Sequence, residues 1–322
     1  MGNKRKTNRV TYLLLSIAIL AVGFAGVSFQ NSSPIKPKTV EQFTKEIAFV
    51  ADTQAPLWIE TLYLASNHNE LATELLFNEI NDRHPLSFFI LGDIVGLSYS
   101  NSSWKRMDLY LHTCESNGIP VHACLGNHEY IGEGRKGEMN FQKRFPDHVN
   151  TGYVKVEDSI AVVLLNSNFG SMQVADTAKQ SRWYIHTMDS LDHAPNIEFI
   201  VVGCHHSPYS NSKIVGSSVE VQKRFVPPFI HSKKAKLFVS GHSHNFEYFH
   251  REGKDFVVVG GGGGLHQPMV KPSNRIPDEA KGYNPMFHYL TIKRDGGHLM
   301  VCSHRLKEDF SGYAEGLNFV IN

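Results

Sequence analysis

An excess of charge of either sign is missing from this sequence. Its 32 Lys and Arg residues offset 31 Asp and Glu residues, and the formal net charge is +1. A balanced charge provides no basic field for nucleic acid, so we expect no nucleic-acid partner. The glycine run at 260–264 is not followed by Gly-Lys-Ser or Gly-Lys-Thr, which excludes a P-loop for nucleotides. Cysteine is scarce, with four residues; Cys114 and Cys124 could pair, but the sequence alone does not decide this.

The N-terminus differs from the rest of the chain. Four basic residues within the first nine precede an uncharged run over 11–29, which is long enough to cross a bilayer as a helix. The basic flank predicts a single-pass membrane anchor whose N-terminus stays in the cytoplasm, with everything after Gln30 outside it. Cleavage of this segment as a signal peptide, followed by secretion, is the alternative.

The remaining residues predict one α/β domain without internal repeats. We expect a basic tip and transmembrane anchor over 1–30, a linker over 31–45, the domain over 46–305 and a C-terminal extension over 306–322. Apolar residues at helical spacing predict helices over 69–81 and 177–191. Ser102 and Ser103 predict the cap of another helix, which Gly118 would end. Asp295-Gly296-Gly297 predicts a hairpin turn.

Five apolar strands in this domain are each followed by Asp, Asn or His. Singly, each such residue is typical of a turn or a helix cap. Together they indicate a site, because ligands bind at the carboxyl ends of strands in open α/β sheets. The five segments are Asp52-Thr53-Gln54, Gly92-Asp93, Gly126-Asn127-His128-Glu129, Cys204-His205-His206 and Gly241-His242-Ser243-His244.

The side chains of these segments favour a catalytic metal centre. They offer carboxylates, amide carbonyls and imidazoles, and no thiolate belongs to the set. Mixed oxygen and nitrogen ligands suit Mn, Fe or Zn and argue against a structural zinc site built on cysteines. Seven candidate ligands exceed what one ion needs. We therefore expect two divalent or trivalent ions that share a carboxylate, about 3.5–4 Å apart as in other hydrolases.

These motifs resemble those of the calcineurin-like metallophosphoesterase superfamily, which includes the purple acid phosphatases. The resemblance covers about residues 46–303 and implies a four-layer α/β/β/α sandwich with a di-metal site. It implies that Asp93 bridges the ions and takes part in catalysis. The other implied ligands are Asp52, Gln54 and His244 for the first metal, and Asn127, His205 and His242 for the second.

The resemblance also implies residues that face the substrate. His128 would stabilise the transition state or protonate the leaving oxygen. His205 is preferred to His206 as the ligand because it lies four residues before Tyr209, which matches the spacing in the family. His206 and Tyr209 are then expected, with His128, to contact the substrate.

Two residues depart from the pattern of the family. Gln54 stands where an imidazole is usual, which should weaken the first metal site and hints at diester or pyrophosphate substrates. Gly96 stands where many members have an Asp that orients the catalytic His or a Tyr that binds iron. The partner that orients His128 is therefore not identified by the sequence.

The expected activity is hydrolysis of a phosphoester outside the cytoplasm. A metal-bound hydroxide would attack phosphorus in line, and the substrate would be a phosphorylated small molecule or a phosphodiester. The alternative, favoured by the departures at Gln54 and Gly96, is a non-catalytic metal- or phosphate-binding module on the same scaffold.

Overall fold

The computed structural model describes residues 44–322, and the predicted anchor over 1–30 lies outside this range. Over the described range, no helix has the length and apolar character needed to cross a membrane.

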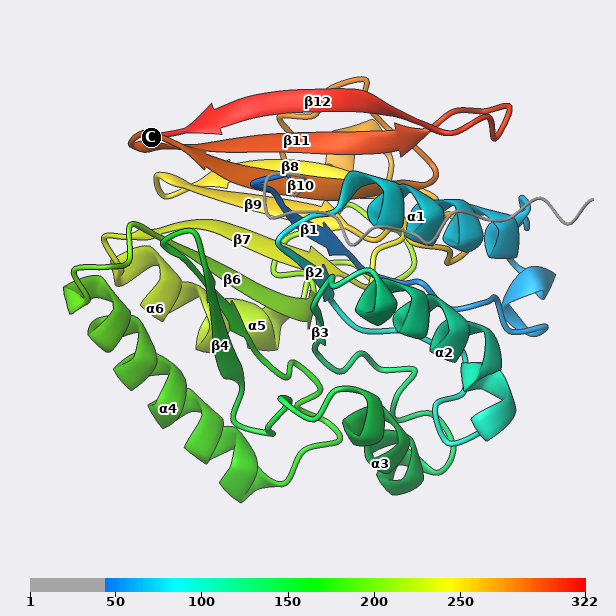
Figure 1. Ribbon diagram of the computed structural model, residues 1–322, viewed down its shortest axis with the longest axis horizontal. Helices are drawn as coiled ribbons and strands as arrows, with labels where there is room; N and C mark the ends of the chain where they lie inside the picture. Colours follow the sequence, from blue (N-terminus) through cyan, green and yellow to red (C-terminus); the bar gives the residue numbers. More distant parts are fainter. Residues whose placement is uncertain (1–43) are drawn as a thin grey trace, which may run out of the picture. The chain divides into compact units, whose positions relative to one another are not determined.

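The described residues form two six-stranded sheets and six α-helices (Figure 1). The strands are β1 (Ile47–Val50), β2 (Ser87–Ile90), β3 (Val121–Ala123), β4 (Tyr153–Glu157), β5 (Ile160–Leu164), β6 (Phe199–His206), β7 (Ala235–Gly241), β8 (Phe246–Arg251), β9 (Lys254–Val259), β10 (His288–Asp295), β11 (His298–Leu306) and β12 (Tyr313–Ile321). The helices are α1 (Asn69–Arg83), α2 (Asn101–Ser116), α3 (Gly134–Arg144), α4 (Val174–His193), α5 (Val219–Arg224) and α6 (Val226–His231), with short 3-10 helices η2 (Glu60–Leu62) and η3 (Pro272–Asn274).

Each sheet contains a set of adjacent parallel strands. One sheet has the order β12-β11-β10-β1-β2-β3, and the other has the order β4-β5-β6-β7-β9-β8. Strands β1, β2 and β3 are parallel to one another, as are β5, β6, β7 and β9. Parallel neighbours end on the same side of a sheet, so the segments after these strands lie together.

Three apolar cores explain the layers. The core between the two sheets includes Phe49 and Phe89, whose rings stack with centroids 5.2 Å apart, and Leu237 from the opposite sheet. A second core lies between the first sheet and helices α1 and α2, and a third lies between the second sheet and helices α4 to α6. The chain therefore has a mixed α/β fold with two sheets, consistent with the expected fold class.

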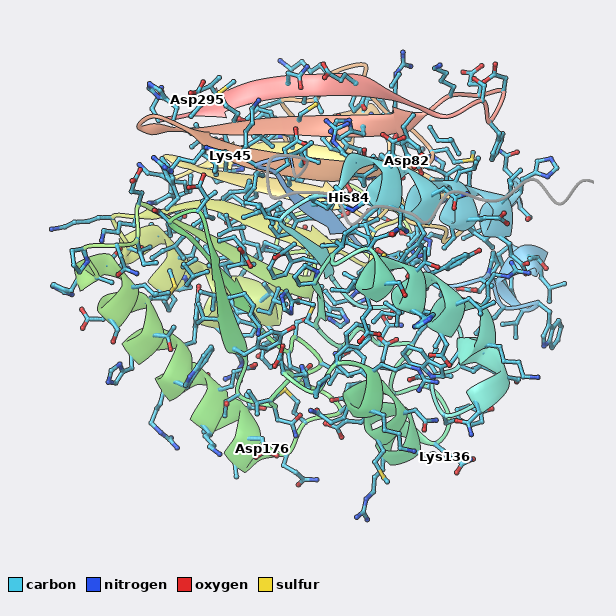
Figure 2. The ribbon with its side chains drawn as sticks, viewed as in Figure 1. Lys45, Asp82, His84, Lys136, Asp176 and Asp295 are labelled. Carbon is cyan, nitrogen blue, oxygen red and sulfur yellow. The ribbon has the colours of Figure 1, made fainter. Side chains whose placement is uncertain are left out.

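Lys136 on α3 and Asp176 on α4 lie on the outer surface (Figure 2).

Most predicted elements are present, and one predicted helix cap lies elsewhere. The predicted helices correspond to α1 and α4, and the Asp295-Gly296-Gly297 turn joins β10 to β11. Helix α2 begins at Asn101, before Ser102 and Ser103, so these two residues lie in its first turn and do not cap it. Cys114 and Cys124 are both free. Within 306–322, residues Tyr313–Ile321 form β12, which pairs with β11 and so extends the sheet.

A buried histidine makes the stability of this fold depend on pH. The His148 ring is 2% exposed and packs edge-on against Phe141 and Tyr153. Burial lowers its pKa from 6.5 to about 4. In the unfolded chain His148 is protonated below about pH 6.5, whereas in the folded chain it stays neutral until about pH 4. Between these pH values protonation favours the unfolded chain, so the free energy of unfolding falls as pH is lowered, by up to roughly 3 kcal/mol.

Replacing His148 by Phe should remove this contribution. We expect the difference in the free energy of unfolding between variant and wild type to shift in favour of the variant as pH falls from 7 to 4.5. Urea denaturation at several pH values measures the difference. The exposed His193 is the matched control, and His193→Asn should leave the pH profile unchanged. Parallel profiles for wild type and His148→Phe would contradict the prediction.

Candidate metal centre

The ends of the parallel strands bring all seven predicted ligands together. Asp52 and Gln54 follow β1, Asp93 follows β2 and Asn127 follows β3. The three histidines come from the other sheet, with His205 at the end of β6 and His242 and His244 after β7. Five of the seven have relative exposures of 5% or less, and they are Asp52, Gln54, Asp93, His205 and His244. The group thus lies between the two sheets at their shared rim.

One half of the group surrounds His205. Its Nε2 lies 3.0 Å from Asn127 Oδ1, 3.2 Å from Asp93 Oδ2 and 3.2 Å from His242 Nδ1. Its Nδ1 donates to the Leu91 carbonyl at 2.9 Å, because a carbonyl oxygen only accepts. This bond fixes the ring and directs Nε2 at the other candidate ligands, as a backbone partner commonly does for a metal-binding histidine.

The other half surrounds His244. Its Nδ1 donates to the Leu265 carbonyl at 2.7 Å, and its Nε2 lies 3.4 Å from Asp52 Oδ1. The Gln54 amide lies 3.5 Å from the same nitrogen. Hydrogen bonding orients this amide so that its nitrogen donates to the backbone carbonyls of Asp93 (2.9 Å) and Asp52 (3.2 Å). Its oxygen therefore faces His244, which makes it available to a cation.

The residues present fit two cations. Asp52 Oδ1 is buried and has no hydrogen-bond partner, although Oδ2 of the same carboxylate accepts from the His242 amide at 2.9 Å. A buried carboxylate oxygen without a partner is costly unless a cation compensates it. Two sets of three residues each have their donor atoms within 4.8 Å of one another. One set is Asp52, Asp93 and His205, and the other is His205, His206 and His242. Asp93 groups with Asp52 on one side and lies 3.2 Å from His205 on the other, so it lies where the two halves meet, as a shared ligand must.

Opposing charges tune the groups at the centre. Burial alone would raise the pKa of Asp93, but nearby His205 and His128 hold it far below its usual range. The converse applies to His205, whose pKa rises to about 9 against the effect of burial because Asp93 is adjacent. The pKa of His242 is lowered by burial and by the neighbouring histidines. The site thus stabilises negative charge on Asp93, as a bridging ligand requires.

The backbone at three candidate ligands has positive φ angles. They are 61° at Asp52, 51° at Asp93 and 66° at His242. Left-handed conformations are uncommon outside glycine, and such residues gather at functional sites because the surrounding structure must hold them there. Here the conformation turns each side chain back from the end of its strand toward the centre.

Glu129 holds part of this backbone, a role that the sequence did not indicate although the residue lies in the predicted motif. Its buried carboxylate accepts from the amides of Asp93 (3.0 Å), Ile94 (3.0 Å) and Gly126 (2.8 Å). Burial, followed by the charge of Asp93, raises its pKa to about 7. Glu129 therefore ties the loop after β3 to the loop after β2, which carry Asn127 and Asp93.

The glycine run at 260–264 forms a close backbone contact around the centre. At Gly264, an added Cβ would lie 2.5 Å from Cε1 and 2.8 Å from Nε2 of the His244 ring. A Cβ at Gly126 would likewise overlap the carboxylate and amide of Asp93. Only glycine allows these approaches, so the run is not a loose loop.

Gly264→Ala should therefore displace the His244 ring and break its bond to Leu265. We expect the affinity for metal to fall on the order of 10- to 100-fold, as when a residue that supports a ligand is lost. Metal titration by calorimetry measures this. Gly282, where a Cβ would meet nothing within 4 Å, serves as control. Because its φ is +75°, Gly282→Asn is the fair substitution there, and equal losses in both variants would contradict the prediction.

His128 is oriented by the backbone carbonyl of Gly96, one of the two residues that depart from the family pattern. Its Nδ1 donates to the Gly96 carbonyl at 2.9 Å, and its Nε2 points toward Glu60 Oε1 at 3.7 Å and Asp93 Oδ2 at 3.9 Å. A Cβ at Gly96 would lie 2.9 Å from Leu57 Cδ2 and 3.0 Å from the Ala55 carbonyl. The segment at 55–57 therefore fills the space that a side chain at position 96 would need. No signal in the sequence indicated Glu60.

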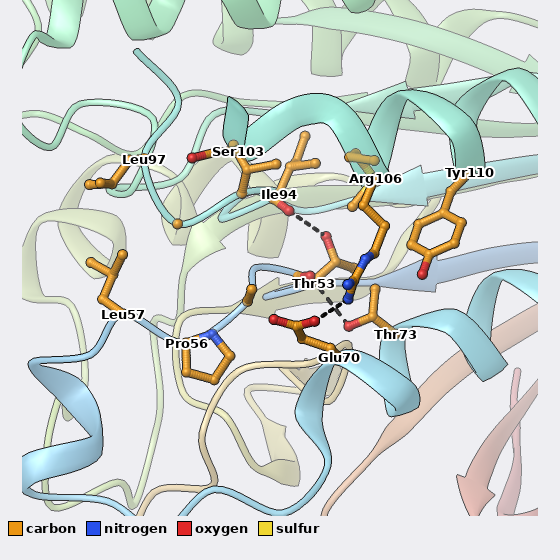
Figure 3. Close-up of a pocket in the computed structure, with 14 residues that line it drawn as sticks. Thr53, Pro56, Leu57, Glu70, Thr73, Ile94, Leu97, Ser103, Arg106 and Tyr110 are labelled. Carbon is orange, nitrogen blue, oxygen red and sulfur yellow. Dashed lines mark hydrogen bonds and ion pairs between the residues drawn. The ribbon is translucent and has the colours of Figure 1, made fainter. Parts of the chain in front are cut away.

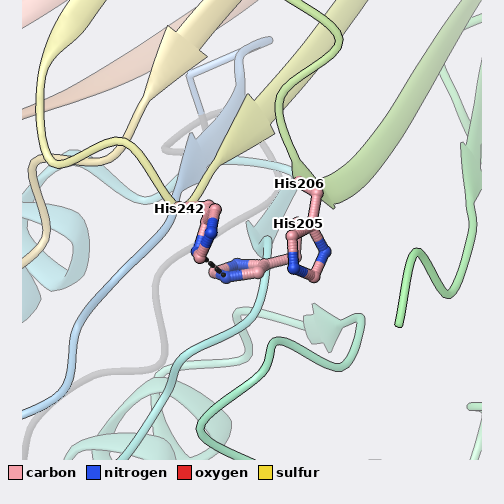
Figure 4. Close-up of side chains that lie close together, drawn as sticks. All are labelled: His205, His206 and His242. Atoms are coloured by element: carbon pink, nitrogen blue, oxygen red, sulfur yellow. Dashed lines mark hydrogen bonds between the residues drawn. The ribbon is translucent and has the colours of Figure 1, made fainter. Parts of the chain in front are cut away.

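The remaining two predicted residues lie differently. His206 is close to the centre: its ring centroid is 4.5 Å from that of His242, its Nδ1 lies 2.8 Å from Ser167 Oγ, and burial lowers its pKa to about 3 (Figure 4). The Tyr209 ring packs against Phe249 and Phe256 and is not among the residues that line the cavity at the centre, so its contact with a substrate stays a prediction.

A cavity of about 360 Å³ opens at the centre. Its polar lining comes from Asp93, Asn127, His128, His242 and His244, together with Glu60 and Gln267. Its apolar lining comes from Tyr63, Leu64, Ile214 and Val215. Five of these residues are in the predicted set, whereas the apolar wall comes from segments that no motif marks.

Comparison with known proteins identifies the group to which this fold belongs. The family model described as calcineurin-like phosphoesterase matches residues 45–246. No curated protein sequence matches the chain. Among solved structures, the protein described as the anchor in the inner membrane complex of Plasmodium (GAP50) is 14% identical with a TM-score of 0.62, over 86% of this chain and 88% of that one.

Two further structures are similar in fold. A purple acid phosphatase from yellow lupin seeds is 15% identical with a TM-score of 0.61, and the match covers 86% of this chain and 53% of that one. A dimetal phosphatase from Danio rerio is 12% identical with a TM-score of 0.52, over 86% of this chain and 98% of that one. At these identities the likeness is one of fold.

Proposed function

The chain belongs to the calcineurin-like phosphoesterase family, and from this premise we propose that it hydrolyses a phosphoric ester at a centre of two metal ions. The observation that supports the proposal is the convergence of seven oxygen and nitrogen donors from five strand ends, including a buried Asp52 oxygen without a partner. Mn, Fe and Zn all suit such a donor set.

The proposed ligand sets follow the two halves of the group. One ion would be held by Asp52, Gln54 and His244, and the other by Asn127, His205 and His242, with Asp93 shared between them. When bound, the ions supply the positive charge that activates the attacking water and offsets charge on the phosphoryl oxygens. Glu129 and the carbonyls of Leu91 and Leu265 keep the ligands in place.

His128 is the proposed proton donor to the leaving oxygen. The Gly96 carbonyl accepts from its Nδ1, so Nε2 faces the cavity and carries a proton whenever the ring is protonated. Burial opposes protonation, but Asp93 raises the pKa of His128 above its usual value. A proton on Nε2 can then pass to the oxygen that departs from phosphorus. His206, held by Ser167, is proposed to line the path of the substrate.

We also propose that the catalytic domain lies outside the cytoplasm, tethered by the apolar run over 11–29. The support is the length of that run and its basic flank. Protease treatment of intact cells tests this: digestion of the domain before lysis is expected. N-terminal sequencing of the recovered protein distinguishes a retained anchor from a cleaved signal.

The activity is tested with the full-length chain loaded with Mn²⁺. Hydrolysis of p-nitrophenyl phosphate is compared with hydrolysis of bis-p-nitrophenyl phosphate, and bound metal is measured on the same samples. Turnover of either substrate that is removed by chelation and restored by metal supports the proposal. Two bound metal ions without turnover of any phosphoester would instead support the non-catalytic binding module.

A further inference from the structure

Exposed apolar side chains gather beside the centre, in the segment that contains η2. Sixteen large apolar side chains among residues 44–322 are strongly exposed, and four of them lie within six residues of one another: Trp58 (73%), Ile59 (49%), Leu62 (64%) and Tyr63 (81%). A fifth, Ile214 (54%), lines the same cavity as Tyr63. An apolar patch beside a catalytic centre indicates a binding surface, whereas isolated exposed residues do not.

The segment is held in place at its base. Glu60 accepts from the Leu57 amide at 2.6 Å, and the Thr61 hydroxyl donates to the Trp58 carbonyl at 2.6 Å. Leu57 packs against Gly96. Beneath the segment, Pro56 and Leu57 line a separate cavity of about 230 Å³, with the Arg106–Glu70 ion pair at its edge (Figure 3). The arginine is thus paired away from the metal centre.

Apart from the proposed metal ions and the ring of His128, the cavity at the centre offers no cationic group to a second negative charge on the substrate. No Lys or Arg is among the residues that line it, and Glu60 adds a carboxylate 3.7 Å from His128 Nε2. A phosphomonoester carries nearly two negative charges at neutral pH, because its second pKa is about 6. A diester carries one. The lining therefore suits a phosphodiester better, and its apolar wall needs an apolar group to cover it.

We propose that the substrate is a phosphodiester that bears an alkyl or acyl chain, and that this chain lies along the apolar wall formed by Tyr63, Leu64, Ile214 and Val215. This inference rests on the proposed phosphoesterase activity. Water supplies the oxygen that bonds to phosphorus, the bond from phosphorus to the leaving oxygen breaks, and that oxygen takes a proton. The products are a phosphomonoester and an alcohol.

The apolar patch extends beyond the cavity, so it can contact a longer alkyl or acyl chain of the substrate than the cavity alone could. Trp58, Ile59 and Leu62 are exposed and do not line the cavity itself. Tryptophan and tyrosine are common where proteins meet the surface of a bilayer, because each has an apolar body and a polar atom. A free amphiphile and a lipid in a bilayer can both present a phosphodiester with an apolar chain. The experiment below distinguishes these two sources of substrate.

The test uses the full-length chain with Mn²⁺ and a series of p-nitrophenyl alkyl phosphodiesters with one chromophore and one charge. We expect kcat/KM for the hexyl ester to exceed that for the ethyl ester on the order of tenfold, the effect of burying about two methylene groups. In Tyr63→Ser combined with Ile214→Ser, the ratio should fall to about 1–2. The matched control is Val174→Ser combined with Ile185→Ser, which removes exposed apolar side chains from α4 and should keep the ratio.

A second arm presents p-nitrophenyl dodecyl phosphate in phosphatidylcholine vesicles. Hydrolysis there that falls in Trp58→Ser with Leu62→Ser identifies a bilayer source, whereas a chain-length gain only with soluble esters identifies a free amphiphile. A ratio near 1 in the wild type, with bis-p-nitrophenyl phosphate still cleaved, overturns the inference and leaves the proposed function standing. Equal loss in the control variant also overturns it. Failure to cleave any phosphoester with metal bound removes the proposed function and the inference with it.

Discussion

Replacing Asp93 by Asn is expected to lower kcat/KM on the order of 10³-fold or more while the protein stays folded. Asp93 Oδ1 accepts from the His128 amide at 2.8 Å, and the Asn oxygen can take over this bond. The amide nitrogen then occupies the place of Oδ2, 3.2 Å from His205 Nε2. A neutral donor there replaces the negative charge that both metal ions would share, so metal content should fall together with turnover.

The measurement combines steady-state kinetics, metal analysis and thermal unfolding. Asp255→Asn is the matched control, because Asp255 is also buried and hydrogen bonded, accepting from the Tyr248 hydroxyl at 2.9 Å, but lies at the other end of β9. Activity of Asp255→Asn within a few-fold of wild type would show that loss of a buried carboxylate is not itself the cause. Wild-type kinetics and metal content in Asp93→Asn would contradict the proposed shared ligand.

His128→Ala is expected to show a loss that depends on the leaving group. For diphenyl phosphate, whose phenol needs a proton as it departs, we expect kcat to fall about 10²- to 10⁴-fold. For bis-p-nitrophenyl phosphate the loss should be much smaller, because p-nitrophenolate leaves without protonation. Metal content should not change, since the His128 ring is oriented by the Gly96 carbonyl and is not among the proposed ligands.

Two outcomes would reject this role for His128. Equal losses on both diesters would indicate that the ring stabilises charge on phosphorus and does not protonate the leaving group. Loss of metal in parallel with activity would indicate that the ring, whose Nε2 is 3.9 Å from Asp93 Oδ2, is itself a ligand. Glu60→Gln provides a related variant: Glu60 lies 3.7 Å from the same nitrogen, and its charge should matter only where His128 must be protonated.

The sequence was sufficient to predict that the seven residues lie together, because each of them lies at or just after the end of a short apolar strand. Continuous apolar strands of this kind are typical of buried parallel sheets, in which neighbouring strands end at the same edge. The positions of Asp52, Asp93 and Asn127 in the sequence therefore imply that these side chains lie together. The choice of His205 over His206 remains a prediction. The structure supports it through the Leu91 bond, which directs the His205 ring at Asp93.

What the sequence could not supply is the surroundings of these ligands. The segment that carries Glu60 and Tyr63 has neither helical nor strand periodicity, and its position depends on the absence of a side chain at Gly96. The spacing to Tyr209 was conspicuous, yet that residue packs into an aromatic cluster with Phe256. Local pattern cannot distinguish an aromatic residue that meets a substrate from one that meets another strand.

The origin of the ligands in two different sheets links metal binding to the cohesion of the whole domain. Asp52, Asp93 and Asn127 belong to one sheet, and the three histidines belong to the other. Ions held by both sets, as proposed, would join the sheets across their apolar interface, and each ion would act as a cross-link that the unfolded chain cannot form. An ion present at a hundred times its dissociation constant would add about 2.7 kcal/mol to the free energy of unfolding. By the same linkage, loosening the packing of Phe49 on Phe89 in the core between the sheets should lower the affinity for metal.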